Sequence, residues 1–267
     1  MCRVEGHRLV MEALSHPRTR DLFRSVLVSR EALGRGELGG KLNDLLEIVH
    51  GKNGCMVNLA SQQVVNAASD TQTPQGVVAV LKIPPSYVPD SATIIRRKQS
   101  KLFLILDGVS DPGNAGTLLR SSLAVGVEAV ILLPSSCDIW SPKAVRSSMG
   151  AAFKVPTVSL GSWDECITFM EKCGLDASNI YAATMEGSSS TPSKPHYAVD
   201  WVGGNGAALV IGKEGQGLSN QVREYAKLGK IKSVYVPMET GIESLNAAIC
   251  GSVILFEYHR QHCTIVQ

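Results

Sequence analysis

The sequence predicts an α/β protein with two folded parts, and three observations support this prediction. Residues 1–83 alternate short apolar strands with amphipathic helices, over a length that suits one small domain. Residues 84–100, "PPSYVPDSATIIRRKQS", contain three prolines and the basic cluster Arg96-Arg97-Lys98, a composition typical of a linker. From Lys101 to the end, fully apolar strands alternate with helices, which is the pattern of a parallel sheet covered on both faces.

Composition excludes several classes of protein. The chain has 267 residues, of which 44% are hydrophobic and 19% charged, with a net charge of +2, so charge alone neither indicates nor excludes a nucleic-acid partner. Aromatic residues make up only 5%, which argues against a stacking surface for single-stranded nucleic acid. The seven cysteines form no CxxC pair, so we expect neither a metal site nor a disulfide framework.

The sequence contains no apolar run of membrane-spanning length and opens without a signal-peptide pattern. We therefore expect no membrane association and no targeting peptide in this chain. The compartment stays open between the cytoplasm and an organelle, either a mitochondrion or a chloroplast.

The first part is expected to form a compact α/β unit. A first helix should place Val4, Leu9, Val10, Ala13 and Leu14 on one face. The strands expected next are 25–29, 55–60 and 76–83, and the helices are 40–51 and 61–69, the latter capped by Ser61.

In the second part, three strand ends carry glycine-rich or polar loops. The expected strands are 102–108, 128–134, 155–160, 179–184, 207–215 and 232–238, and the helices are 115–126, 141–153, 163–174, 219–226 and 244–261. Ligands of such sheets bind at the carboxyl ends of the strands. Residues 107–114, 212–217 and 237–246 are therefore the candidate site.

The first of these loops leads into a helix with a single charge. Asn114 is suited to capping this helix, and Arg120 is its only ionisable side chain between Ala115 and Gly126. A guanidinium there suits a phosphate, a carboxylate or a group that must lose a proton; the alternative is a surface or interface arginine.

The other two loops offer a carboxylate, a hydroxyl and an amide. Gly212 and its neighbouring glycines permit a close approach of a ligand to the backbone, and Glu214 among them is either structural or catalytic. In the third loop Ser244 is the expected helix cap, and Asn246 either supports that cap or is functional. Neither a Walker phosphate loop nor a GxGxxG fingerprint is present, which argues against an enzyme that uses a dinucleotide.

Taken together, three segments resemble a known family. "LDGVSDPGNAGTLLRSSLAVGVEAVIL", "LVIGKEGQGLS" and "VPMETGIESLNAAICGSVILFEY" look like the three ordered motifs of the SpoU (TrmH-like) branch of the SPOUT RNA methyltransferases. The resemblance covers residues 101–267, and residues 1–83 resemble the family's ribosomal-protein-like α/β substrate-binding domain. One departure is that Ala247 and Ala248 follow Asn246, where many members have Val-Ser.

The resemblance implies a fold and an activity. It implies a SPOUT-type parallel sheet with a C-terminal trefoil knot, a homodimer, and methyl transfer from S-adenosylmethionine to a ribose 2′-hydroxyl of tRNA or rRNA. DNA is not the expected partner, because it lacks that hydroxyl. By motif position, Gly212, Val236 and Leu245 hold the cofactor through their backbone, and the active-site side chains are Asn114, Arg120, Glu214, Ser244 and Asn246.

The role of Arg120 stays open between a phosphate-binding group and a base that is deprotonated only in the assembled site. The alternative to an enzyme is a catalytically inactive RNA-binding member of the same family, which is disfavoured because all five side chains are present.

Overall fold

The structure is a computed structural model that describes residues 1–89, 101–185 and 192–264. It divides into two compact units, one of Met1–Pro85 with Asp138–Lys154 and one of Ser86–Cys137 with Val155–Gln267. Most of the expected linker, including Arg96-Arg97-Lys98, lies outside the described residues. Within the described ranges, no helix has both the length and the apolar character needed to cross a membrane.

The first unit contains a four-stranded sheet in the order β1-β4-β2-β3. The strands are β1 Cys2–Glu5, β4 Val77–Leu81, β2 Phe23–Ser29 and β3 Met56–Ala60. β4 runs antiparallel to β1 and β2, whereas β2 and β3 are parallel. The expectation of a helix that includes Val4 is wrong, because Val4 pairs with Ala79 in the sheet, a long-range contact that local periodicity does not reveal.

Helices complete this unit. Within Met1–Pro85 the α-helices are α1 His7–Ser15, α2 Pro17–Arg20, α3 Arg30–Leu33, α4 Gly36–Val49 and α5 Gln62–Ala67, with a 3₁₀ turn at Lys52–Gly54. Leu9, Val10, Ala13 and Leu14 are buried on α1, as predicted. Ser61 caps α5 by accepting a hydrogen bond from the N–H of Val64, also as predicted.

The single helix predicted over 141–153 is instead two short helices, α8 Pro142–Ser147 and α9 Ala151–Lys154. Met149 and Gly150 between them have φ angles of 51° and 87°. Positive φ is incompatible with a continuing right-handed helix, so the chain breaks there.

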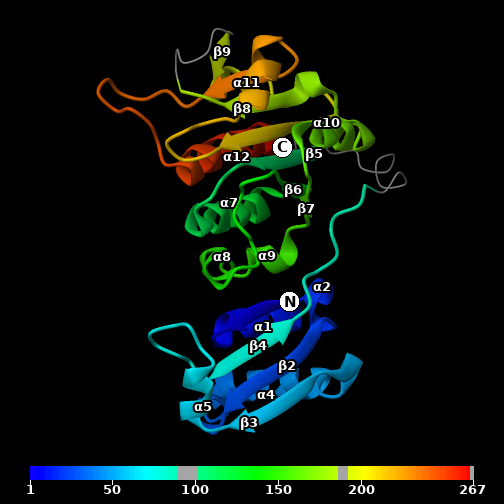
Figure 1. Cartoon of the computed structure of the whole chain (residues 1–267), viewed down its shortest axis with the longest axis vertical. Coiled ribbons are helices and arrows are strands. Elements are labelled where there is room, and N and C mark those ends of the chain that lie inside the picture. Colours follow the sequence, from blue (N-terminus) through cyan, green and yellow to red (C-terminus); the bar gives the residue numbers. More distant parts are fainter. Residues whose placement is uncertain (90–100, 186–191, 265–267) are drawn as a thin grey trace. The chain divides into compact units, whose positions relative to one another are not determined.

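The second unit contains a seven-stranded sheet in the order β7-β6-β5-β10-β8-β11-β9 (Figure 1). The strands are β5 Lys101–Asp107, β6 Ala129–Leu132, β7 Thr157–Ser159, β8 Ile180–Ala183, β9 Ser193–Pro195, β10 Gly206–Gly212 and β11 Lys232–Tyr235. Every pairing is parallel, which confirms the predicted sheet type. The trefoil knot stays a prediction.

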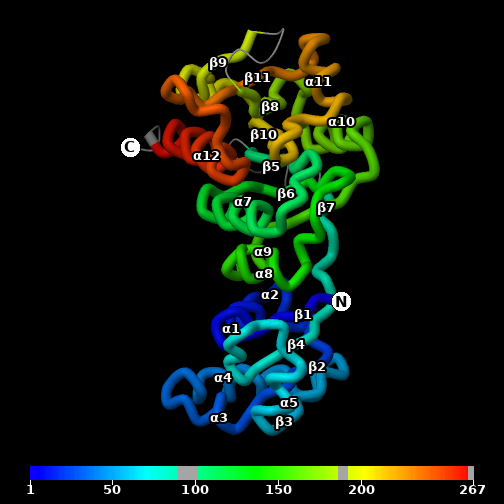
Figure 2. Tube along the Cα trace, turned by 60° about the vertical axis from the view of Figure 1, so that its left-hand side comes forward, coloured from blue at the N-terminus to red at the C-terminus, as the bar shows by residue number. Residues whose placement is uncertain are grey.

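Helices cover both faces of this sheet (Figures 1 and 2). They are α7 Pro112–Val125, α10 Trp163–Lys172, α11 Asn220–Lys227 and α12 Ala247–Thr264, and two 3₁₀ turns lie at Ala177–Asn179 and His196–Ala198. Trp163 of α10 and Val222 of α11 join a buried core with Phe103 and Val210 of the sheet.

On the opposite face α12 packs closely on α7 and β10. A Cβ atom added to Gly251 would lie 2.6 Å from Leu118 Cδ2, so the absence of a side chain permits this approach. The hydroxyls of Ser121 and Ser252 also form a hydrogen bond of 2.7 Å between the two helices. This packing places the start of α12 beside the carboxyl ends of β5 and β10.

Candidate active site at the carboxyl ends of three strands

Side chains from the three predicted loops meet through one amide. The Nδ2 group of Asn114 donates to Oε1 of Glu214 across 2.8 Å, and its Oδ1 accepts from Nδ2 of Asn246 across 2.9 Å. The structure therefore brings together three of the five side chains that the sequence proposes for the active site.

In the first loop the helix begins earlier than predicted. Asp111, not Asn114, is the N-cap of α7, because its Oδ1 accepts from the N–H of Asn114 across 2.9 Å. Pro112 follows at the first helical position, where its fixed φ suits the helix and its missing N–H costs nothing. Asn114 is thus in the first turn, and its side chain is available to the other loops.

The second loop is a closed turn that carries Glu214. Lys213 N–H donates to the carbonyl of Gly217 across 2.9 Å, and Gly217 N–H donates back across 2.8 Å. A Cβ atom at Gly212 would lie 2.5 Å from the carbonyl carbon of Gly217, which explains why glycine is required where the loop returns to the strand.

A buried carboxylate anchors this loop, and the sequence reasoning missed it. Asp107, the last residue of β5, is 6% exposed, and its Oδ2 accepts from the N–H of Ser219 across 2.6 Å. Ser219 is in turn the N-cap of α11. Burial raises the pKa of Asp107, while the hydrogen bonds from Ser219 oppose this rise. The sequence feature that could have revealed Asp107 is a carboxylate placed directly at the end of an apolar strand.

In the third loop the predicted cap is wrong. Oδ1 of Asn246 accepts from the N–H groups of Ala248 and Ile249 at 2.9 and 3.2 Å, so Asn246 caps α12 and Ser244 does not. β11 also ends at Tyr235, three residues earlier than expected, which lengthens the loop before the helix. Ser244 is exposed, and its hydroxyl has no hydrogen-bond partner in the described part of the chain.

Arg120 does not take part in the amide network. Its side chain is exposed on α7 and forms no ion pair or hydrogen bond with any described residue. The guanidinium therefore keeps its full capacity to bind an anion.

The residues proposed for cofactor binding lie on two of these loops. Val236 follows β11, Leu245 precedes Asn246, and both are half-buried, as is Gly212. Between residues 236 and 245 the only backbone–backbone hydrogen bond among described residues joins Ile242 N–H to the Glu239 carbonyl, at 3.4 Å. This loop thus offers unpaired donors and acceptors next to apolar side chains, which fits a nucleoside-containing cofactor such as S-adenosylmethionine.

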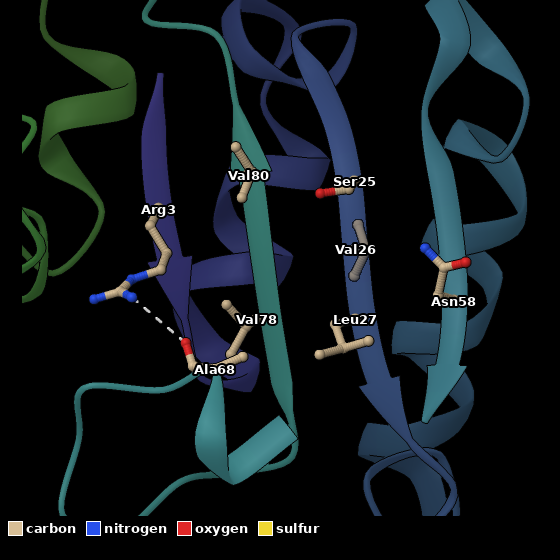
Figure 3. Close-up of a pocket in the computed structure, with 8 residues that line it drawn as sticks. All are labelled: Arg3, Ser25, Val26, Leu27, Asn58, Ala68, Val78 and Val80. Atoms are coloured by element: carbon tan, nitrogen blue, oxygen red, sulfur yellow. Dashed lines mark hydrogen bonds between the residues drawn. The ribbon is translucent and has the colours of Figure 1, made fainter. Parts of the chain in front are cut away.

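The first unit contains a separate hollow of about 300 Å³ on its sheet, lined by side chains from all four strands (Figure 3). Its one charged side chain, Arg3, is already bound to Glu5, Asp70 and the carbonyl of Ala68. No residue singled out in the sequence lines this hollow, so it is not the candidate active site. Among the described residues, no group of three or more His, Cys, Asp or Glu side chains could hold a metal ion.

The fold and the loops define an α/β protein whose candidate ligand site lies at the carboxyl ends of parallel strands. Residues 101–256 match the SpoU rRNA Methylase family, and residues 3–87 match the domain described as RNA 2′-O ribose methyltransferase substrate binding. The chain belongs to the SpoU rRNA methylase family.

Individual relatives agree with this assignment. The mitochondrial rRNA methyltransferase 3A of Danio rerio is 30% identical over 97% of this chain and 63% of its own length. The 23S rRNA (guanosine(2553)-2′-O)-methyltransferase of Bacillus subtilis is 26% identical over 95% of this chain and 86% of its own. This chain spans only 54% of the human mitochondrial rRNA methyltransferase 3.

A similar solved structure is that of the SpoU methyltransferase AviRb from Streptomyces viridochromogenes in complex with AdoMet. The two structures superimpose with a TM-score of 0.77 at 26% sequence identity, and the match covers 98% of this chain and 90% of the AviRb chain.

Proposed function

We propose that this protein transfers the methyl group of S-adenosylmethionine to a ribose 2′-hydroxyl of rRNA or tRNA. The observation that carries the proposal is the meeting of Asn114, Glu214 and Asn246 at the strand ends of a SpoU-family sheet. Relatives named as rRNA methyltransferases and a similar structure with AdoMet bound support the same reaction.

The backbone of the second and third loops is the proposed cofactor site. Gly212, Val236 and Leu245 would hold S-adenosylmethionine, which supplies an already activated sulfonium methyl when bound. The protein then has to align the ribose oxygen with that methyl and make the oxygen nucleophilic. Asn114 fixes the relative positions of all three loops, which is the kind of preorganisation that alignment requires.

Arg120 is the proposed contact with the RNA phosphate next to the target ribose. It is exposed and without a partner among described residues, so it can form a bidentate pair with a phosphate. Arginine is a poor free base because it stays protonated, so a role as base would require deprotonation in the assembled site. Ser244 and Glu214 are proposed to contact the reacting ribose or the cofactor.

We infer that residues 1–83 form the substrate-binding domain, an inference that the match over residues 3–87 supports. A chimera that carries residues 1–83 of a relative should change the methylated nucleotide. Unchanged target choice would contradict this assignment.

We also infer a homodimer. Leu123 of α7 and Ile249 and Phe256 of α12 are 40%, 53% and 49% exposed, and a second copy would remove this apolar surface from water. Light scattering should give twice the mass of the chain, and a monomer mass would contradict the inference.

The test of function is transfer of labelled methyl groups to total RNA by wild type, Arg120→Ala and Arg120→Lys. We expect label in a linkage resistant to alkaline hydrolysis, as a 2′-O-methylated site must be, and its loss in Arg120→Ala. Arg120→Lys should also be impaired, because lysine cannot form a bidentate pair; near-normal activity would contradict the phosphate role. Lys172→Ala, at an exposed cation of α10 in the same unit, is the control.

An inactive RNA-binding member of the family is the alternative. It would bind RNA but label none of it, even with the cofactor bound.

A further inference from the structure

A fourth loop at the carboxyl edge of the sheet, outside the three that the sequence indicates, contacts the first of them. It is the loop after β6, residues 133–137, and it emerges beside the loop after β5 because these two parallel strands pair up to Leu106 and Leu132. The N–H of Cys137 donates to the carbonyl of Val109 across 2.9 Å, and Val109 is buried. The backbone of the β6 loop thus holds the first candidate loop from one side.

The side chain of Ser136 adds a second connection. Its hydroxyl accepts from the N–H of Gly108 across 3.1 Å and donates to the carbonyl of Leu106 across 2.9 Å. These two backbone groups flank Asp107, so one hydroxyl holds the chain on both sides of that residue. It takes the place of a strand partner at the point where the pairing of β5 with β6 ends.

A tight turn brings Ser136 to this position. Its N–H donates to the carbonyl of Leu133 across 3.2 Å, which closes a four-residue turn with Pro134 second and Ser135 third. Proline is favoured at the second position, and Ser135 has a φ angle of 66°, which is uncommon for a residue other than glycine. Such a conformation persists where surrounding contacts compensate its cost, and the hydrogen bonds of Ser136 are contacts of this kind.

The backbone that this hydroxyl holds is connected to two candidate loops. Asp107 anchors the Glu214 loop through its side chain. Gly108 begins the first loop, and a Cβ atom added there would lie 3.7 Å from the Cβ atom of Lys213 in the second loop. A displacement of the peptide between Asp107 and Gly108 would therefore reach the second loop as well as the turn that leads to Asn114.

We propose that Ser136 is a positioning residue for methyl transfer, which holds the backbone at Asp107 and Gly108 so that the first loop carries Asn114 to its partners in the other two loops. The inference rests on the proposed function and adds to it a residue from a fourth loop. Both hydrogen bonds of Ser136 go to backbone groups, so it acts through the loop and not on the ligand. Methyl transfer depends on alignment, and a displacement of about 1 Å can reduce a rate by about 100-fold.

The experiment measures steady-state methyl transfer to the RNA pool of the methylation assay by the full chain. Ser136→Ala removes both hydrogen bonds, so kcat should fall by roughly 10- to 100-fold. The apparent KM for RNA and the dissociation constant of S-adenosylmethionine should stay within about threefold, because the proposed contacts with RNA and cofactor remain. Ser136→Thr keeps the hydroxyl and should retain at least about a third of the wild-type kcat.

Ser148→Ala is the matched control. The hydroxyl of Ser148, in the first unit, also accepts one backbone hydrogen bond, from Ala152 N–H at 3.3 Å, and donates one, to the Val145 carbonyl at 2.8 Å. The control should keep its kcat within about twofold of wild type, because alignment at the site is unchanged. An equal fall in kcat in both alanine variants would reflect general destabilisation and overturn the proposal. If Ser136→Ala unfolds, Ser136→Cys replaces it, since a thiol is a weaker donor and acceptor of similar shape, and its kcat should fall between those of Ser136→Thr and the tenfold loss.

Hydrogen exchange at Gly108 provides a measurement that does not depend on catalysis. Exchange in the peptide that contains this amide should be faster in Ser136→Ala than in wild type or Ser148→Ala. If wild type transfers methyl groups and Ser136→Ala keeps the wild-type kcat, the positioning proposal fails and the function stands. If wild type transfers none, the proposed function fails, and equal exchange in all three proteins would overturn the role of Ser136 separately.

Discussion

Asn114 donates a hydrogen bond of 2.8 Å to Glu214, although one hundred residues separate them in the sequence. The same amide accepts from Asn246, so both of its polar atoms have partners and its orientation is defined. Glu214 keeps its second carboxylate oxygen without a hydrogen-bond partner among the described residues. The Asn114 amide thus fixes the orientation of the Glu214 carboxylate and leaves one carboxylate oxygen available to a ligand.

The first prediction concerns this pair. Asn114→Asp replaces the donor with a second carboxylate, and two like charges at hydrogen-bond distance repel each other. We expect the rate of methyl transfer to fall by a factor of at least roughly ten, which corresponds to an increase of about 1.4 kcal/mol in the activation free energy.

The control is the exchange variant Asn114→Asp/Glu214→Gln, in which the new amide can donate to the new carboxylate. It should recover part of the activity under single-turnover conditions. An exchange variant no more active than Asn114→Asp would show that the hydrogen bond itself does not matter.

The second prediction concerns the close approach at Gly212. An alanine there would place its Cβ 2.5 Å from the backbone of Gly217, so we expect Gly212→Ala to lower the free energy of unfolding by about 1–3 kcal/mol. The variant should also weaken S-adenosylmethionine binding in calorimetry.

Gly40→Ala is the control for this prediction. Gly40 lies inside α4, and a Cβ atom added there would have nothing within 4 Å. Alanine at this position should therefore raise the free energy of unfolding by roughly 0.5–1 kcal/mol. If Gly212→Ala unfolds at the same urea concentration as wild type, the loop is more adaptable than its geometry indicates.

The third prediction concerns pH. His7 is 2% exposed, and this burial lowers its pKa below the usual value, with Arg35 acting in the same direction and the hydrogen bond to Ala32 opposing both. The unfolded state therefore binds more protons than the folded state at mildly acidic pH. The stability contributed by neutral His7 is present above about pH 6.5 and is lost as the pH falls towards its folded-state pKa.

Urea unfolding at pH 7.5 and 5.5 checks this expectation. Wild type should lose unfolding free energy on acidification, and His7→Gln, whose amide can still donate to the Ala32 carbonyl, should lose less. His16 also has a lowered pKa, chiefly through burial, so some loss should persist in the variant. Equal losses in the two proteins would mean that His7 does not control this transition.

Much of the fold follows from local sequence. The apolar run over residues 102–106 is buried at 3% exposure or less, and a strand apolar on both faces belongs in a parallel sheet under helices. The three loops also followed from the sequence, because glycine and polar residues directly after such strands are local features and parallel strands end at one edge. Asn114, Glu214 and Asn246 could therefore be expected near each other before any distance was known.

Long-range contacts decided the features of the fold and the site that local sequence does not determine. Val4 lies in a strand because β4, more than seventy residues later, pairs with it. Asp107 is an anchor because its buried position and the N–H of Ser219 coincide only in the folded chain. Asp111 caps α7 and Asn246 caps α12, although in the sequence Asn114 and Ser244 are equally suitable cap residues. Cap residues are similar in energy, so the closure of the three loops selected which side chains cap the two helices.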